Sequence, residues 1–325
     1  MRMSRRDFLH LGLVGAGGLA LGGLMAGCGH KGEGPLTAPS LGELLSARRG
    51  SGDGSGLDVF LGGEDYVAST DNFVVVFLQR RGGDRLFGSQ ARAWLTPTVN
   101  TATRLTPVGP LPAPWFAYAR PDGGPPLPQG LNAFRFTFDR PGLWTLVVET
   151  TTGPRLVGST VVEGAGQGVK PQGHGDTRVV GDPAIPSETP TFDSPRGVSP
   201  ICTRTPSCDM HQVTLKQALA AGKPVAFIVA TPKFCQSRNC GPSLNELIAV
   251  ENDLRGKASF VHAEVYLNDQ TQTIEQQVPS PTFKEWNLQS EPWLFVIDRK
   301  GIIAERFEGG FTAGQVRAAL EPLVG

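Results

Sequence analysis

Apolar and polar positions follow different patterns in two parts of the chain. Between residues 57 and 163, apolar residues form short strand-like runs separated by turn residues, a pattern typical of a β-sandwich. The clearest runs are residues 73–78, 91–95, 134–138, 144–149 and 156–162. After residue 200, short apolar runs alternate with amphipathic helical repeats, which favours an α/β domain over residues 201–325. The expected fold class is a multidomain chain, all-β and then α/β.

The α/β part is organised around a strand, a loop and a helix. Residues 224–230 are apolar and end in turn residues, which predicts a buried strand. Residues 231–239 are polar and predict a loop, and Cys240 then opens a helix with Pro242 in its first turn. The remaining expected elements are helices over 213–220 and 281–286, strands over 258–266, 293–297 and 302–307, and a last helix from Thr312.

Other stretches are rich in glycine, serine or proline and predict no regular structure. Residues 29–56 have the composition of a flexible tether, and residues 164–200 that of an extended linker. The proline-rich residues 107–128 predict a long loop within the β-sandwich. With a targeting segment over residues 1–28, these stretches divide the chain into two folded domains, 57–163 and 201–325.

The first 28 residues have the pattern of an export signal. Residues 4–9, SRRDFL, match the twin-arginine motif, and an apolar, glycine-rich run follows. Residues 24–28, LMAGC, resemble a bacterial lipobox, which implies lipidation of Cys28 after cleavage. Cleavage without a lipid is the alternative. We therefore expect an exported, membrane-anchored lipoprotein that faces the periplasm or the cell exterior.

Charge and cysteine content narrow the functional classes. The 30 basic and 30 acidic residues give a formal net charge of zero, which gives no indication of nucleic-acid binding. The chain has five cysteines, and four of them form two close pairs, Cys202/Cys208 and Cys235/Cys240. Paired cysteines fit an oxidising compartment, where each pair is expected to form a disulfide. No cofactor is expected.

The pair Cys235 and Cys240 carries the strongest chemical indication. A thiol at a helix N-terminus lies beside unpaired backbone N–H groups and the positive end of the helix dipole, and both favour the reactive thiolate. The sequence therefore predicts Cys240 as the nucleophile and Cys235 as the thiol that resolves a mixed disulfide. The alternative is an inert disulfide that staples an exported domain.

The same stretch resembles the thioredoxin superfamily. Residues 240–243, CGPS, match its Cys-Gly-Pro-Cys motif with the last cysteine replaced, and residues 290–310, SEPWLFVIDRKGIIAERFEGG, look like its cis-proline and last two strands. The resemblance implies that Pro292 is cis, packs beside the cysteines and, with Glu291, contacts an extended substrate. The chain departs from the family in its Cys-x4-Cys spacing and in Ile228, which lies near the family's usual buried acid.

Two further resemblances bear on the domains. Residues 231–240, TPKFCQSRNC, resemble the motif of one peroxiredoxin group, which would make Cys235 peroxidatic and Cys240 resolving. This motif has an extra residue, and residues 290–292 lack the arginine of that group, so we rank the peroxiredoxin resemblance below the thioredoxin one.

Residues 139–144, DRPGLW, resemble a corner of immunoglobulin-like domains, with Trp144 at the position of the usual tyrosine.

The second cysteine pair has two interpretations. A small disulfide loop between Cys202 and Cys208 suits an exported chain. The alternative is a copper site, because Cys208, Met210 and His211 offer soft ligands within four residues. The Sco-type copper chaperones share the thioredoxin-like fold, but their Cys-x3-Cys spacing is absent here. His262 lies within an apolar strand and is interpreted as a core histidine.

Three functions therefore follow as hypotheses. The first is thiol–disulfide exchange through Cys240 and Cys235, with thiols or disulfides of exported proteins as partners. The second is copper binding, and the third is a non-enzymatic interaction protein that retains a structural disulfide. The membrane is expected as a further partner through the lipid anchor on Cys28.

Overall fold

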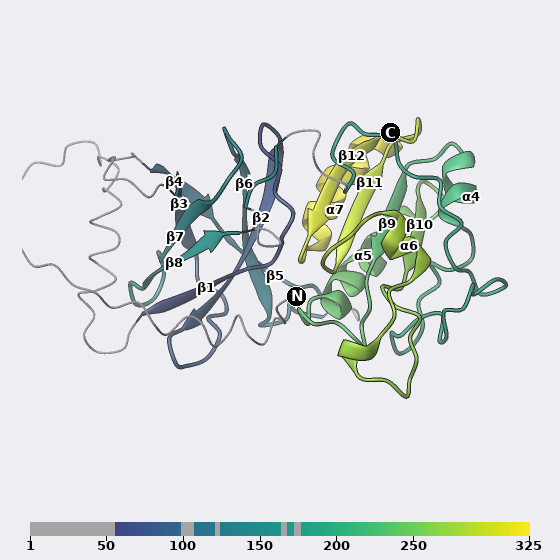
Figure 1. Ribbon diagram of the computed structural model, residues 1–325, viewed down its shortest axis with the longest axis horizontal. Helices are drawn as coiled ribbons and strands as arrows, with labels where there is room; N and C mark the ends of the chain where they lie inside the picture. Colours follow the sequence, from purple (N-terminus) through teal and green to yellow (C-terminus); the bar gives the residue numbers. More distant parts are fainter. Residues whose placement is uncertain (1–55, 99–106, 121–123, 164–167, 172–176) are drawn as a thin grey trace, which may run out of the picture. The chain divides into compact units, whose positions relative to one another are not determined.

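The computed structural model describes residues 56–98, 107–120, 124–163, 168–171 and 177–325, which form an all-β region and an α/β region (Figure 1). The all-β region has two antiparallel sheets, ordered β1-β2-β6-β5 and β4-β3-β7-β8. Their strands are β1 Leu57–Leu61, β2 Asp71–Arg80, β3 Ala91–Pro97, β4 Val108–Ala113, β5 Trp115–Ala117, β6 Gly130–Thr137, β7 Trp144–Thr150 and β8 Val157–Val162.

Alternation along the strands builds one apolar core between the two sheets. Val74 and Val76 of β2 enter this core from the first sheet, and Ala93 and Leu95 of β3 enter it from the second. Successive side chains of a strand point to opposite faces, so residues two apart share the core face. Trp144 also packs in this core, and its indole N–H donates to the carbonyl of Arg140 at 3.2 Å. This hydrogen bond closes the corner that the sequence indicated.

The proline-rich stretch 107–128 is not one long loop, which corrects the expectation from sequence. Strands β4 and β5 lie within it, and each is the edge strand of its sheet. An edge strand bonds to a neighbour on one side only, so a proline without an N–H is tolerated there. Pro110 and Pro112 therefore fit the outer strand, although their composition favours a loop.

The α/β region has a central sheet ordered β10-β9-β11-β12, with β9 and β10 parallel and β11 antiparallel to both of its neighbours. Its elements are α4 Leu215–Ala220, β9 Val225–Val229, α5 Cys240–Leu254, β10 Ser259–Ala263, η2 Ile274–Gln276, α6 Pro281–Glu285, β11 Trp293–Ile297, β12 Ile303–Glu308 and α7 Ala313–Val324. Every helix and strand expected from sequence has a counterpart here, and η2 is an addition.

Helices cover both faces of this sheet. On β9, Ala226 and Ile228 belong to one core cluster with residues of α5 and α7. The alternate residues Val225, Phe227 and Val229 belong to another core cluster, with residues of α4 and Trp286 at the end of α6. Because both faces of β9 are buried, its sequence is apolar throughout. The result is a three-layer α/β/α arrangement (Figure 1).

Residues 177–200 have no helix or strand, yet they pack against the α/β region. The backbone N–H of Leu215, at the start of α4, donates to Thr189 Oγ1 at 2.9 Å. The indole N–H of Trp286 donates to Ser187 Oγ at 2.8 Å, and both side chains are buried. Backbone hydrogen bonds attach the stretch as well, since the N–H groups of Gly181 and Ala184 donate to the carbonyls of Ile303 and Gly301.

The targeting features lie outside the described residues. These features are the twin-arginine motif at residues 4–9, Cys28 and the tether over 29–56, of which only the last residue is described. Within the described residues, none of the helices has the length and apolar character that a membrane crossing requires.

Candidate functional site

Cys235 and Cys240 lie at the junction of β9 and α5, as the sequence predicts. The loop after β9 carries Cys235, and α5 begins at Cys240. Asn239 is the N-cap residue, but its side chain makes no cap hydrogen bond and donates instead to the carbonyl of Gly309 at 3.0 Å. The N–H of Cys240, the first residue of the helix, has no acceptor within the helix. It donates to Cys235 Sγ at 3.2 Å.

The order of the two thiols is the reverse of the sequence prediction. A hydrogen bond from the Cys240 thiol is the main cause that lowers the pKa of Cys235 to about 6, and Ser237 and the Cys240 N–H add to it. Burial raises the pKa of Cys240 well above its ordinary value, and the charge of Cys235 raises it further. Cys240 is fully buried, whereas Cys235 is partly exposed. Cys235 therefore has the lower pKa and is the more exposed of the two residues, which are the properties that the sequence analysis expected of Cys240.

The reason for this reversal is the direction of the side chains. Cys240 lies at the helix start, but its side chain belongs to the apolar core that β9 and α5 share. The N–H of Cys240, at the start of the helix, points toward the loop rather than toward its own side chain. Cys235 Sγ accepts this N–H, so the residue in the loop receives the stabilisation.

Glu291 and Pro292 border this pair. The Glu291–Pro292 peptide is cis, as the resemblance implies. Glu291 Oε1 accepts the N–H of Gln236 at 2.9 Å, and its carboxylate oxygen and the two sulfurs all lie within 4.8 Å of one another. The backbone carbonyl of Glu291 accepts the Ser237 hydroxyl, and that of Pro292 accepts the Gly309 N–H. Both residues are buried, so substrate contact by them stays a prediction.

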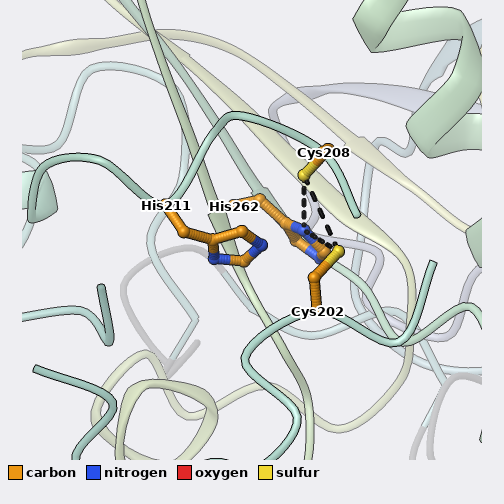
Figure 2. Close-up of side chains that lie close together, drawn as sticks. All are labelled: Cys202, Cys208, His211 and His262. Atoms are coloured by element: carbon orange, nitrogen blue, oxygen red, sulfur yellow. Dashed lines mark hydrogen bonds between the residues drawn. The ribbon is translucent and has the colours of Figure 1, made fainter. Parts of the chain in front are cut away.

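Cys202 and Cys208 belong to a different site, which we call the buried Cys/His cluster. Its members are Cys202, Cys208, His211 and His262, all buried, with one ligand atom from each lying within 4.8 Å of the others. Figure 2 shows the four side chains converging, with both sulfurs facing the ring of His262. All four described cysteines of the chain are free thiols in the structure, so both expected disulfides stay predictions.

The distances within the cluster are short. The two sulfurs are 3.8 Å apart, and His262 Nδ1 lies 3.4 Å from Cys208 Sγ and 3.9 Å from Cys202 Sγ. His262 Nε2 lies 3.0 Å from the carbonyl oxygen of Ala230, which can only accept. Nε2 therefore carries a proton, and Nδ1 is the ring nitrogen that faces the two sulfurs.

The cluster differs from the copper site considered from sequence. Cys208 and His211 are members, as expected, and Met210 is buried in the core cluster that also contains Cys202 and Cys208. His262 completes the group, although the sequence analysis assigned it to the core. Its Nε2 is hydrogen-bonded to the backbone, as expected of a core histidine, and its Nδ1 faces the thiols. A single strand pattern gives no indication of this, because the partners are far away in sequence.

Comparisons with known proteins give distant likenesses alone. No family model matches the sequence, and no curated protein matches it. A thiol:disulfide interchange protein of the thioredoxin family from Chlorobium tepidum TLS aligns with 46% of this chain and 100% of that chain, at 15% identity and a TM-score of 0.31. The PKD domain of the human VPS10 domain-containing receptor SorCS2 aligns with 50% of this chain and 100% of that chain, at 17% identity and a TM-score of 0.18. Both TM-scores are low, and neither likeness transfers a function.

The fold and the site together define a broad class of protein. The chain joins an all-β region of two sheets to an α/β region in which a central strand leads into a partly exposed cysteine of lowered pKa and a buried cysteine. This arrangement is compatible with thiol–disulfide chemistry.

Proposed function

We propose that this protein is a thioredoxin-like thiol–disulfide exchange protein that acts through Cys235 and Cys240. One observation carries the proposal: Cys235 Sγ accepts the first-turn N–H of α5 at 3.2 Å beside a second thiol, and its pKa is lowered to about 6. A thiol of that pKa is about 90% ionised at pH 7, whereas an ordinary thiol of pKa about 8.5 is about 3% ionised. An inert staple does not require such a thiolate.

The exchange proceeds in two steps that balance. The Cys235 thiolate attacks one sulfur of a client disulfide, and the other client sulfur leaves as a thiolate and takes up a proton. Cys240 then loses its proton to water, and its sulfur attacks Cys235, which releases the second client thiol. The client disulfide gains two electrons, and Cys235 and Cys240 become a disulfide. The reverse sequence oxidises a client dithiol.

The partners proposed are exported proteins. The twin-arginine motif and Cys28 support export and lipid anchoring outside the cytoplasm. In that location the all-β region, proposed as an immunoglobulin-like sandwich, serves as a spacer or docking module between the anchor and the redox domain. Release of a Cys28→Ser variant from membranes tests the anchor, and unchanged membrane association contradicts it.

Mixed-disulfide trapping tests the exchange function. Cys240→Ser keeps the reactive thiolate and removes the thiol that resolves the intermediate, so client proteins accumulate as mixed disulfides with Cys235. Cys235→Ser is the matched control and traps none, because the buried Cys240 does not reach a client. The measurement is non-reducing electrophoresis followed by identification of the trapped peptides. Equal trapping by both variants, or by neither, rejects the proposal.

A second candidate function is reduction of a hydroperoxide by the same pair. The observation in its favour is the thiol order, because the peroxiredoxin resemblance requires Cys235 to be the reactive thiolate. Cys235 attacks the peroxide oxygen and releases an alcohol or water, and Cys240 then displaces water from the sulfenic acid to form the disulfide. The causes that lower the pKa of Cys235 include no cation, which ranks this second. Hydroperoxide consumption faster than disulfide exchange would reverse the ranking.

A further inference from the structure

We propose that the buried Cys/His cluster is a closed, four-coordinate site for Zn²⁺. The inference does not depend on thiol–disulfide exchange at Cys235 and Cys240. Two thiolates and two imidazoles are the ligand set of a structural zinc site, and such sites have no open coordination position. All four residues of the cluster are buried, which fits a closed site.

The first argument is geometric. A tetrahedral zinc ion, with Zn–S bonds of about 2.3 Å and Zn–N bonds of about 2.0–2.1 Å, sets its sulfurs about 3.8 Å apart and each sulfur about 3.5–3.6 Å from a nitrogen. The cluster has its sulfurs 3.8 Å apart and His262 Nδ1 at 3.4 and 3.9 Å from them. The ligand atom of His211 lies within 4.8 Å of the other three. Closing the tetrahedron thus takes a movement of the His211 ring of little more than about 1 Å.

The second argument is the state of the two histidine rings. His262 donates from Nε2 to the carbonyl of Ala230, an arrangement that orients metal-binding histidines and leaves the other nitrogen as the ligand. His211 is 1% exposed, and within the described part of the chain neither of its ring nitrogens has a hydrogen-bond partner. Buried polar atoms are nearly always satisfied, so an unpartnered buried imidazole beside two thiols indicates a missing ligand.

The third argument is charge. In a zinc-bound site both cysteines are thiolates, and their two negative charges balance the charge of the ion. A carboxylate lies close by, because Glu264 accepts the N–H and the hydroxyl of Thr203, next to Cys202. A monovalent ion would leave a net negative charge in a buried site that already has a carboxylate beside it, which is costly. The charge count therefore favours a divalent ion over Cu⁺.

The scaffold holds the ligands before any ion binds. Strand β10 is an edge of the sheet, and the loop that carries Cys208 and His211 attaches to it through the N–H of His262, which donates to the carbonyl of Met210 at 2.9 Å. Thr203 fixes the Cys202 segment to Glu264, which lies directly after β10. The ion would therefore join the loop of residues 202–211 to the sheet, a structural role rather than a catalytic one.

Thiol footprinting on the reduced wild-type chain tests this site without any variant. The protein is alkylated with and without one equivalent of Zn²⁺, and the modified peptides are counted by mass spectrometry. Zinc is expected to protect Cys202 and Cys208 and to leave Cys235 reactive. Alkylation of Cys202 and Cys208 at the same rate in both samples would overturn the proposal, as would protection confined to Cys235 and Cys240.

Variants then assign the ligands. Co²⁺ is the spectroscopic probe, because tetrahedral Co²⁺ bound by thiolates absorbs visible light strongly, and Zn²⁺ should displace it at one equivalent. His211→Ala should weaken Zn²⁺ binding by at least about 100-fold, the upper range for loss of a residue that only supports a ligand. Cys208→Ser should weaken it similarly, and Cys235→Ser, from the other pair, should bind as the wild type. Wild-type affinity in His211→Ala, or binding of Cu⁺ with no binding of Zn²⁺ or Co²⁺, overturns the zinc assignment.

Discussion

Two cysteine pairs of similar spacing in one domain have opposite surroundings. Cys235 and Cys240 are separated by four residues and lie at a helix start, where one thiol is partly exposed. Cys202 and Cys208 are separated by five residues and are buried with two histidines. In the first pair, Cys235 Sγ accepts the Cys240 N–H, and the Ser237 oxygen lies 3.3 Å from the same sulfur. The second pair faces Nδ1 of His262.

The difference teaches what decides the chemistry of a thiol pair. Hydrogen-bond donors stabilise a thiolate and leave its remaining lone pairs free, so the Cys235 sulfur stays available to attack a substrate. In the buried pair, a hydrogen bond from Cys208 lowers the pKa of Cys202, whereas the same bond and burial raise the pKa of Cys208. A cation bound between the two sulfurs would stabilise both of them as thiolates. Spacing alone does not distinguish the two cases. Four experiments can break or sharpen this contrast.

The largest expected effect is stabilisation by zinc. Zinc that binds only the folded chain stabilises it by about 4 kcal/mol at a free concentration of about 1,000 times Kd. At roughly 2–4 °C per kcal/mol for a chain of this size, removing zinc with a chelator under a non-thiol reductant should lower Tm by about 10 °C. Because both thiols must lose their protons, the stabilisation should vanish on acidification. Thermal unfolding followed by circular dichroism measures the change.

Cys208→Ser is the control for this experiment. Its transition should be the same with and without chelator, since the site lacks a ligand. Cys235→Ser should respond to the chelator as the wild type does. A wild-type transition that chelation leaves unmoved would end the contrast between the two pairs.

The next largest effect is the pH profile of alkylation at Cys235. Its rate follows the thiolate fraction, so it should rise through pH about 6 and level off above about 7, because the pKa of Cys235 is lowered to about 6. At pH 5 the thiolate fraction exceeds that of an ordinary thiol about 300-fold, and lower intrinsic nucleophilicity reduces the advantage to about 20-fold. Iodoacetamide labelling with peptide mass spectrometry measures it. A rate that still rises above pH 8 would contradict the assignment.

How far the sequence predicts this molecule depends on the range of each interaction. Strand β9 and helix α5 follow from local apolar patterns, and both lie where predicted. Strand β4 was missed, because the tolerance for proline depends on an edge position that only the assembled sheet defines. A local pattern therefore predicts an element correctly when the element's own residues determine its structure, and fails when neighbouring strands do.

The sites show the same limit. The sequence located Cys235 and Cys240, but their order depends on where the Cys240 side chain packs. His262 lies beside Cys202 because the loop of residues 202–211 attaches to strand β10, and this contact joins residues more than fifty positions apart. A histidine inside an apolar strand looks like a core residue until its neighbours are known.

A smaller effect is expected when Cys240 loses its thiol. The hydrogen bond from the Cys240 thiol is the main cause that lowers the pKa of Cys235, and the backbone N–H remains in a variant. Cys240→Ala should move the alkylation midpoint of Cys235 above about 6, and a rise of one unit would reduce the thiolate fraction at pH 6 about five-fold. Cys240→Ser keeps a hydroxyl donor and should shift less. Identical profiles for the wild type and Cys240→Ala would show that the side chain has no part.

The smallest effect tests whether the two pairs are independent. Two hydrogen bonds connect them. His262 donates to the carbonyl of Ala230, before the Cys235 loop, and the N–H of Lys233, within that loop, donates to Thr203 Oγ1. The causes that lower the pKa of Cys235 nevertheless include no member of the buried Cys/His cluster. Zinc loading should thus leave the alkylation midpoint of Cys235 unchanged and alter its rate by less than about two-fold.

The measurement is the pH profile of Cys235 alkylation with and without one equivalent of Zn²⁺, and Thr203→Ala provides the control. In that variant the hydrogen bond from Lys233 is lost, and the contact of His262 with the carbonyl of Ala230 remains as the named link between the two pairs. If zinc moves the midpoint by one unit in the wild type and not in Thr203→Ala, the pairs are coupled through the loop, and the buried Cys/His cluster regulates the thiolate. If the profiles coincide in both, the domain contains one reactive and one structural thiol pair, each defined by its own neighbours.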